Sequence, residues 1–239
     1  MMADRRIVVT GMGITSCLGN TLEDVTKSLQ EAKSGITFAE EYSELGMKSQ
    51  VHGVPDLSDA DFKKLIPKQS LRFMGNNGKY AYIAMERAIE DAGLKPEDYQ
   101  ENPRVAGILG QGGTSTRDIT ETVDAVKAGG PRWKNKVGPF RVCRSMGSTV
   151  SAVLSTAFKI QGASFSISSA CSTGAHCIGT GFQQILLDNA DMAFCGAGEL
   201  ISVTSYCDCL IYYFTLTALA LLCISCIKYH FVLLSHSNI

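Results

Sequence analysis

The sequence has no excess of basic residues: 22 lysines and arginines face 23 aspartates and glutamates, giving a formal net charge of −1. Proteins that bind nucleic acids usually carry a basic surplus that neutralises phosphates, so this class is not favoured. The first residues, MMADRRIVVTG, leave no room for the apolar stretch of a secretory signal or for an amphipathic transit peptide. We therefore expect a cytoplasmic protein, in which any charged partner binds a local patch of opposite charge on the surface.

Paired cysteines are missing from the first 200 residues. Five cysteines stand there without CxxC spacing: Cys17, Cys143, Cys171, Cys177 and Cys195. Neither a disulfide framework nor a zinc ribbon is expected from such spacing. What the chain does have is apolar residues, 45% of the total, which is enough for a sizeable core.

Strand-like and helix-like segments alternate along the first 200 residues. Apolar or β-branched runs predict strands at Arg5–Gly11, Val105–Gly110, Ser164–Ser169 and Asp191–Gly196. Apolar residues at helical spacing predict helices after Thr21, over Lys79–Ala92, from Ile119 to Val126, over Met146–Ala157 and over Ser172–Leu187. This alternation predicts an α/β layered fold with a mostly parallel sheet covered on both faces.

Two glycine-rich segments invite comparison with phosphate-binding loops. In GMGITS (Gly11–Ser16), a serine occupies the third glycine position of a dinucleotide fingerprint and the helix opens too late, so we predict a tight turn. GQGGTSTRD (Gly110–Asp118) lacks the GK[ST] ending of a phosphate loop and is predicted to be a flexible turn lining a cavity. No nucleotide site is expected.

Cys171 stands in SSACSTGAHCIG, at a predicted junction between a strand and a helix. Free N–H groups and the helix dipole at such a junction favour a thiolate and can hold an oxyanion. The small neighbours Ala170, Ser172 and Gly174 would let a carbonyl group approach closely. These residues alone leave two interpretations open, a nucleophile and a buried structural thiol.

The wider sequence resembles the β-ketoacyl-acyl-carrier-protein synthases, most closely type I, over about residues 3 to 199. The resemblance rests on SISSACSTGAHCIG with FKIQGASF before it and FCGAGE after it, and on RRIVVTGMGITSCLGN, SGI, AIEDAGL, NPRV and VGPF. It implies the thiolase-like fold, a five-layer α-β-α-β-α core built from two similar halves, of which this chain resembles the first half. It also implies that Cys171 takes an acyl group from a carrier protein or coenzyme A, and that no cofactor is needed.

Condensation in this family also uses two histidines and a lysine from second-half motifs of the HGTSTPxGD and KxxxGH types. Neither motif occurs here, and the histidines are His52, His176, His230 and His236. His176 follows Cys171 by five residues, about 140° around a helix, which favours a core or interface position over the role of catalytic base. The chain is thus expected to keep the nucleophile and part of the oxyanion hole and to lack the acid–base groups.

The resemblance implies three kinds of partner: an acidic acyl carrier protein, acyl and malonyl thioesters, and a second copy of the chain. Candidate carrier-binding residues are Lys68, Arg72, Arg132, Lys134 and Lys136. An ordinary solvated surface is the alternative for these residues. The strand at Ser164–Ser168 matches the one that pairs across the two-fold axis of the family's homodimer.

Charged residues nearly vanish after residue 200: Ile201–Ile239 contains only Asp208 and Lys228. We therefore divide the chain into a synthase N-terminal domain (1–200) and a hydrophobic tail (201–239) that replaces family sequence. A frameshift, intron read-through or truncated gene model would explain the tail, and Cys209–Ile227 is long enough to cross a membrane. Four cysteines there, Cys207, Cys209, Cys223 and Cys226, give a weak metal-site pattern. The alternative function is a non-catalytic carrier-binding or dimerising half-domain, with or without membrane anchoring by the tail.

Overall fold

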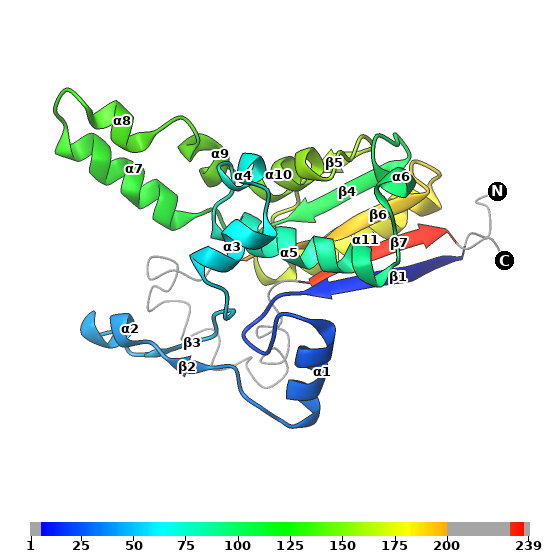
Figure 1. Ribbon diagram of the computed structural model, residues 1–239, viewed down its shortest axis with the longest axis horizontal. Helices are drawn as coiled ribbons and strands as arrows, with labels where there is room; N and C mark the ends of the chain where they lie inside the picture. The colour runs from blue at the N-terminus through cyan, green and yellow to red at the C-terminus, as the bar shows by residue number, and fades with distance from the viewer. Residues whose placement is uncertain (1–5, 200–229, 237–239) are drawn as a thin grey trace.

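A five-stranded mixed sheet in the order β1-β7-β6-β4-β5 organises the chain (Figure 1). Its strands are β1 (Ile7–Ile14), β4 (Val105–Gly110), β5 (Ser164–Phe165), β6 (Met192–Ala197) and β7 (His230–His236). Strand β4 runs parallel to both β5 and β6, whereas β7 is antiparallel to β1 and β6. The computed structural model describes residues 6–199 and 230–236.

The connecting segments are mainly helical. The helices are α1 (Leu22–Gln30), α2 (Glu40–Glu44), α3 (Asp59–Leu65), α4 (Lys68–Leu71), α5 (Asn76–Asp91), α6 (Pro96–Tyr99), α7 (Thr116–Ala128), α8 (Trp133–Val137), α9 (Arg141–Ser145), α10 (Thr149–Ala157), the 3₁₀ turn η1 (Ala170–Ser172) and α11 (Thr173–Leu186). A short antiparallel pair, β2 (Thr37–Phe38) and β3 (Val51–His52), stands apart from the main sheet.

Two hydrophobic cores lie on opposite faces of the sheet, because successive side chains of a strand alternate in direction. In β4, Val105 and Leu109 belong to the core shared with α5 and α10. Ala106 and Ile108 belong to the core shared with α11. The sheet is therefore covered on both faces, and the expected α/β layered fold is confirmed.

The tight turn predicted for GMGITS is wrong for its first four residues, because Gly11 to Ile14 continue strand β1. The glycines serve a close approach of α5 instead. A Cβ atom on Gly11 would stand 2.3 Å from the Ala88 carbonyl oxygen, and one on Gly13 only 1.9 Å from that of Ala84. The turn follows at Ser16 and Gly19, whose main chains exchange two hydrogen bonds.

Most predicted elements have the expected type, with boundaries shifted by a few residues. Strand β4 has the predicted bounds, and α1 begins after Thr21, whose side chain accepts a hydrogen bond from the Asp24 N–H. The strand predicted over Ser164–Ser169 is shorter: β5 ends at Phe165, and the chain then turns toward η1. No strand is predicted in the tail, yet β7 lies within the sheet and its Leu234 is buried.

Helices α7 and α8 project from the body of the molecule as an arm (Figure 1). The apolar residues that predict α7, Ile119, Val123 and Val126, are all exposed there.

The possible membrane segment Cys209–Ile227 and the four tail cysteines lie outside the described residues. Within residues 6–199 and 230–236, no helix is both long and apolar enough to span a bilayer.

Candidate active site around Cys171

Cys171 lies in η1, the turn that leads into α11, and it is exposed. The Thr173 hydroxyl holds this turn closed: it donates to the Ala170 carbonyl oxygen at 2.7 Å and accepts from the Ser169 N–H at 2.9 Å. Ala170 has φ of +49°, a left-handed conformation that is uncommon for a residue with a Cβ atom. Such backbone strain persists only where the surrounding structure enforces it.

The other described cysteines have less favourable surroundings for nucleophilic chemistry. Cys177 and Cys195 are buried, whereas Cys17 and Cys143 are half-buried. Burial raises the pKa of the Cys177 thiol to about 11. Burial, together with the neighbouring Cys177, also raises the pKa of Cys195. Of the five, Cys171 alone combines exposure with a place at a helix N-terminus, where N–H groups and the helix dipole stabilise negative charge.

The loop after β4 lies directly against the Cys171 turn. A Cβ atom on Gly112 would stand 2.8 Å from the Ala170 carbonyl oxygen, so this contact requires glycine. The Gly112 N–H donates to the Glu199 carboxylate, and the Ser168 hydroxyl donates to the Gly112 carbonyl oxygen at 3.3 Å. The segment GQGGTSTRD thus supports the turn that carries Cys171. Nothing in the sequence indicates that Glu199 anchors this loop.

A buried amide pair fixes the start of the same loop. Asn77, at the start of α5, donates to the side-chain oxygen of Gln111, and both residues are almost fully buried. The Gln111 amide nitrogen donates to the Met146 carbonyl oxygen at 2.8 Å. Buried amides are almost always hydrogen-bonded. Because moving the loop would leave these buried groups unpaired, the bonds hold the start of the loop in place. Neither residue stood out in the sequence, since nothing there predicts that α5 and the loop meet.

His176 is exposed, and its Nδ1 lies 2.6 Å from the Ser169 hydroxyl oxygen. The core position predicted as one alternative for His176 is therefore wrong. The other alternative, an interface position, stays a prediction. Within the described residues, no group of three or more histidine, cysteine, aspartate or glutamate side chains is arranged to hold a metal ion.

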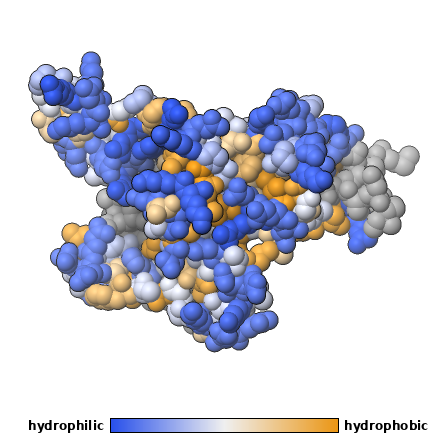
Figure 2. All heavy atoms as spheres, viewed as in Figure 1, coloured by the Kyte–Doolittle hydropathy of each residue, from blue (hydrophilic) through white to orange (hydrophobic). Residues whose placement is uncertain are grey.

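The five predicted carrier-binding residues are all exposed, but they fall into two groups. The α4 group consists of Lys68 in α4 and Arg72 directly after it; the α8 group consists of Arg132, Lys134 and Lys136. Helix α8 lies in the projecting arm, whereas α4 lies closer to the sheet (Figure 1). On the face shown in Figure 2, the surface of the arm is largely hydrophilic. The structure therefore does not join the five residues into one patch.

Aromatic rings and further lysines surround the α4 group. The Arg72 guanidinium lies 6.0 Å and 5.9 Å from the ring centroids of Phe73 and Phe140, within the range of cation–π attraction. Lys63 and Lys64 are exposed in the last turn of α3, which contacts α4. These two lysines are not among the predicted carrier-binding residues, although the run KKLIPKQSLR repeats basic residues at short intervals.

Comparisons with known proteins agree on one family. The model of the family "Beta-ketoacyl synthase, N-terminal domain" matches residues 4–210. The 3-oxoacyl-[acyl-carrier-protein] synthase 1 of Escherichia coli K12 is 47% identical over 204 residues, which are 85% of this chain and 49% of the relative. This chain therefore spans about half the length of the curated relatives it matches.

Solved structures show the same fold. A β-ketoacyl synthase from Burkholderia phymatum matches with a TM-score of 0.74 at 19% identity, covering 98% of this chain and 60% of that one. A ketosynthase solved with its type II polyketide acyl-carrier protein matches with a TM-score of 0.71 at 19% identity, covering 98% and 63%. At these identities the likeness shows the fold alone, and the expected thiolase-like fold is confirmed.

Proposed function

Because this chain belongs to the beta-ketoacyl synthase family, we propose that it takes part in fatty-acid synthesis as a 3-oxoacyl-acyl-carrier-protein synthase, with Cys171 as the acyl acceptor. One observation carries the proposal: Cys171 is exposed at the N-terminus of α11, in a turn held by Thr173 and by the Gly112 loop. The proposed place of action is the cytoplasm.

The acylation step follows from this geometry. The Cys171 thiolate attacks the carbonyl carbon of an acyl thioester, and a new carbon–sulfur bond forms. Main-chain N–H groups at the start of α11 stabilise the oxyanion of the tetrahedral intermediate. The bond to the donor sulfur then breaks, and the donor leaves as a thiolate that takes a proton from water. The product is an acyl-Cys171 thioester and a free carrier thiol.

The proposed acyl donor is an acyl carrier protein, received by the α4 group. Exposed cations steer an acidic partner, and their effect is screened by salt. The α8 group lies further out on the arm and is proposed as a secondary contact. A homodimer is also proposed: β5 stands at one edge of the sheet, hydrogen-bonded to β4, and its Ser164 and Phe165 are exposed.

A second candidate function rests on a different observation. Neither second-half motif of the family occurs in the sequence, and His176 is paired with Ser169. A half-domain with this composition would bind a carrier or dimerise without completing catalysis. Acylation of Cys171 separates the two candidates, because a binding module does not need a reactive thiol.

The experiment is intact-mass and peptide-mass measurement of the 239-residue protein after incubation with acyl-carrier protein. We expect one acyl group on Cys171, removable by hydroxylamine as a thioester is. Cys171→Ala abolishes the mass increase, whereas Cys143→Ala, the matched control, retains it. An acyl group on another cysteine, or no acylation of folded protein, would leave the binding module as the better account.

A further inference from the structure

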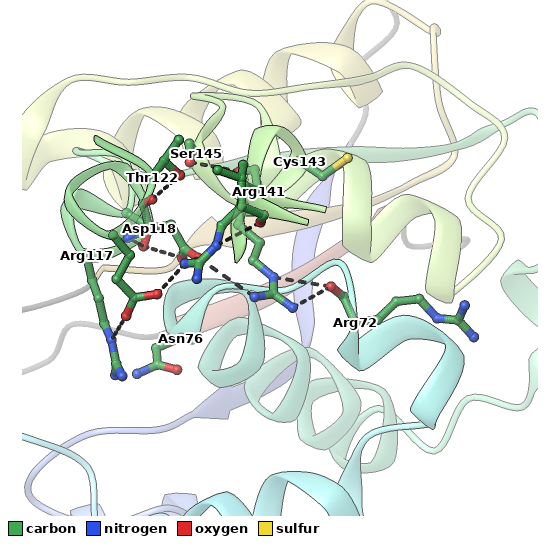
Figure 3. A network of polar contacts seen from close by, with 12 residues as sticks. Arg72, Asn76, Arg117, Asp118, Thr122, Arg141, Cys143 and Ser145 are labelled. Atoms are coloured by element: carbon green, nitrogen blue, oxygen red, sulfur yellow. Dashed lines mark hydrogen bonds and ion pairs between the residues drawn. The ribbon is translucent and has the colours of Figure 1, made fainter. Parts of the chain in front are cut away.

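A cluster of charged side chains joins α7 to α9 at the base of the arm (Figure 3). The side chain of its central member, Asp118, is 11% exposed, and one of its carboxylate oxygens lies 2.8 Å from an Arg141 guanidinium nitrogen. Arg141 also pairs with Glu121 at 2.5 Å, and Glu121 accepts from Arg117 at 2.9 Å. We call these residues, together with Arg144, the Asp118 network.

Within the network, Arg141 and Glu121 each favour the charged form of the other. Burial opposes the charge of Arg141, but hydrogen bonds and charges from Glu121 and Asp118 outweigh it and raise its pKa. The hydrogen bond from Arg117, with further help from Arg141, lowers the pKa of Glu121. Removing one partner from such a group leaves a charge that is poorly solvated and unpaired. The network therefore resists rearrangement.

One side of the network reaches the α4 group. Arg144 donates two hydrogen bonds to the main-chain carbonyl oxygen of Arg72, at 2.7 Å and 3.2 Å, and lies 3.8 Å from Asp118. Figure 3 shows the side chain of Arg72 pointing away from the network, so its carbonyl is held while its guanidinium remains available. Gly75 packs closely as well: a Cβ atom there would lie 3.3 Å from an Asp118 carboxylate oxygen.

The other side of the network reaches the Cys171 turn. The Asp118 carboxylate accepts a hydrogen bond from the Ser115 hydroxyl at 2.7 Å, and Ser115 in turn caps α7. Ser115 ends the loop whose Gly112 lies against Ala170. A continuous path of contacts thus runs from the Arg72 carbonyl through Arg144, Asp118 and the loop to the turn that carries Cys171.

We propose that Arg144 and Asp118 are positioning residues that hold the α4 group and the Cys171 turn in a fixed relation for acyl transfer from a carrier protein. This inference rests on the proposed function. A carrier protein must contact the α4 group while its thioester reaches Cys171. The distance and orientation between the α4 group and the Cys171 turn therefore determine whether both contacts form together. A small acyl donor such as acyl-coenzyme A needs only the Cys171 end.

The test compares the rates of Cys171 acylation by acyl-carrier protein and by acyl-coenzyme A. We expect Arg144→Gln and Asp118→Asn to lower the ratio of these rates roughly tenfold, as loss of a charge-assisted hydrogen bond would. Arg144→Lys, which keeps the charge but has a single donor nitrogen, restores part of the ratio. Reversing the α4 group with Lys68→Glu and Arg72→Glu gives the reference for a lost carrier contact.

Arg104→Gln is the matched control. Arg104 also donates to two carboxylates, those of Asp188 and Asp191, and to the main-chain carbonyl oxygen of Asp188. It lies just before β4, at the end of that strand opposite the Gly112 loop. A purely structural effect would lower both rates in all three variants and leave the ratio unchanged.

An unchanged ratio in Arg144→Gln and Asp118→Asn, or an equal fall in Arg104→Gln, overturns the inference. Thermal melts accompany each assay, and where Arg144→Gln does not fold, Asp118→Asn decides: a ratio equal to that of the wild type in Asp118→Asn overturns the inference there too. If the folded wild-type protein is acylated by neither donor, the proposed function itself fails, which is a different result.

Discussion

At the scale of single residues, the five cysteines of residues 6–199 differ in their exposure and in the groups around them. Cys171 and Cys177 are six residues apart, yet one is exposed in a turn and the other is buried against the sheet. The sequence predicts the junction at Cys171 from the change of strand-like to helix-like residues. It does not predict the left-handed Ala170 or the Thr173 contacts, because these depend on the loop that packs against the turn.

We expect iodoacetamide to modify Cys171 first among the cysteines of residues 6–199 at pH 8. Because the pKa of Cys177 is about 11, roughly one in a thousand of its thiols is ionised at that pH, and burial restricts access further. Peptide mapping over time gives the rates, with Cys171 at least about tenfold faster than Cys177. Raising the pH toward 11 should narrow the difference. Earlier labelling of Cys17, Cys143, Cys177 or Cys195 would contradict this order.

At the scale of helices and strands, apolar spacing identified the elements better than it identified their neighbours. The pattern of Ile119, Val123 and Val126 predicts α7 correctly, although those side chains are exposed on the arm. Gly11 and Gly13 suggested a turn, whereas they allow α5 to lie against β1. The local pattern predicts the helical conformation of α7. Contacts between segments distant in the sequence decide which of its side chains are buried and why β1 carries two glycines.

Two glycines of α11 test how closely that helix packs on β6. A Cβ atom on Gly181 would stand 2.1 Å from the Cys195 sulfur, whereas one on Gly179 meets nothing within 4 Å. Gly181→Ala should therefore destabilise the fold by about 1–3 kcal/mol through overpacking. Gly179→Ala should be neutral or stabilising by up to about 1 kcal/mol, since alanine favours helix. Urea unfolding midpoints provide the comparison, and equal shifts for the two variants would rule out the close contact.

At the scale of the whole molecule, the sheet crosses the division that composition suggests at residue 200. Strand β7 lies between β1 and β6, and among the described strands β1 is hydrogen-bonded to β7 alone. Composition misses this because a strand inside a sheet needs only apolar residues, which the tail has in abundance. The outward face of α11 is also uncovered, with His176, Gly179 and Phe182 exposed. In the five-layer core implied by the family, a second half would cover that face.

The 239-residue protein should therefore acylate Cys171 without completing condensation. Decarboxylation of a malonyl thioester needs donors at the developing enolate, and the cysteine cannot supply them while it holds the acyl group. The family assigns this task to histidines of second-half motifs that the sequence lacks, and His176 is engaged with Ser169. We expect acyl-Cys171 by mass measurement together with background carbon dioxide release from malonyl-carrier protein. Sustained release that disappears in Cys171→Ala would refute this and would mean that other residues of the chain, or a partner, supply the acid–base groups.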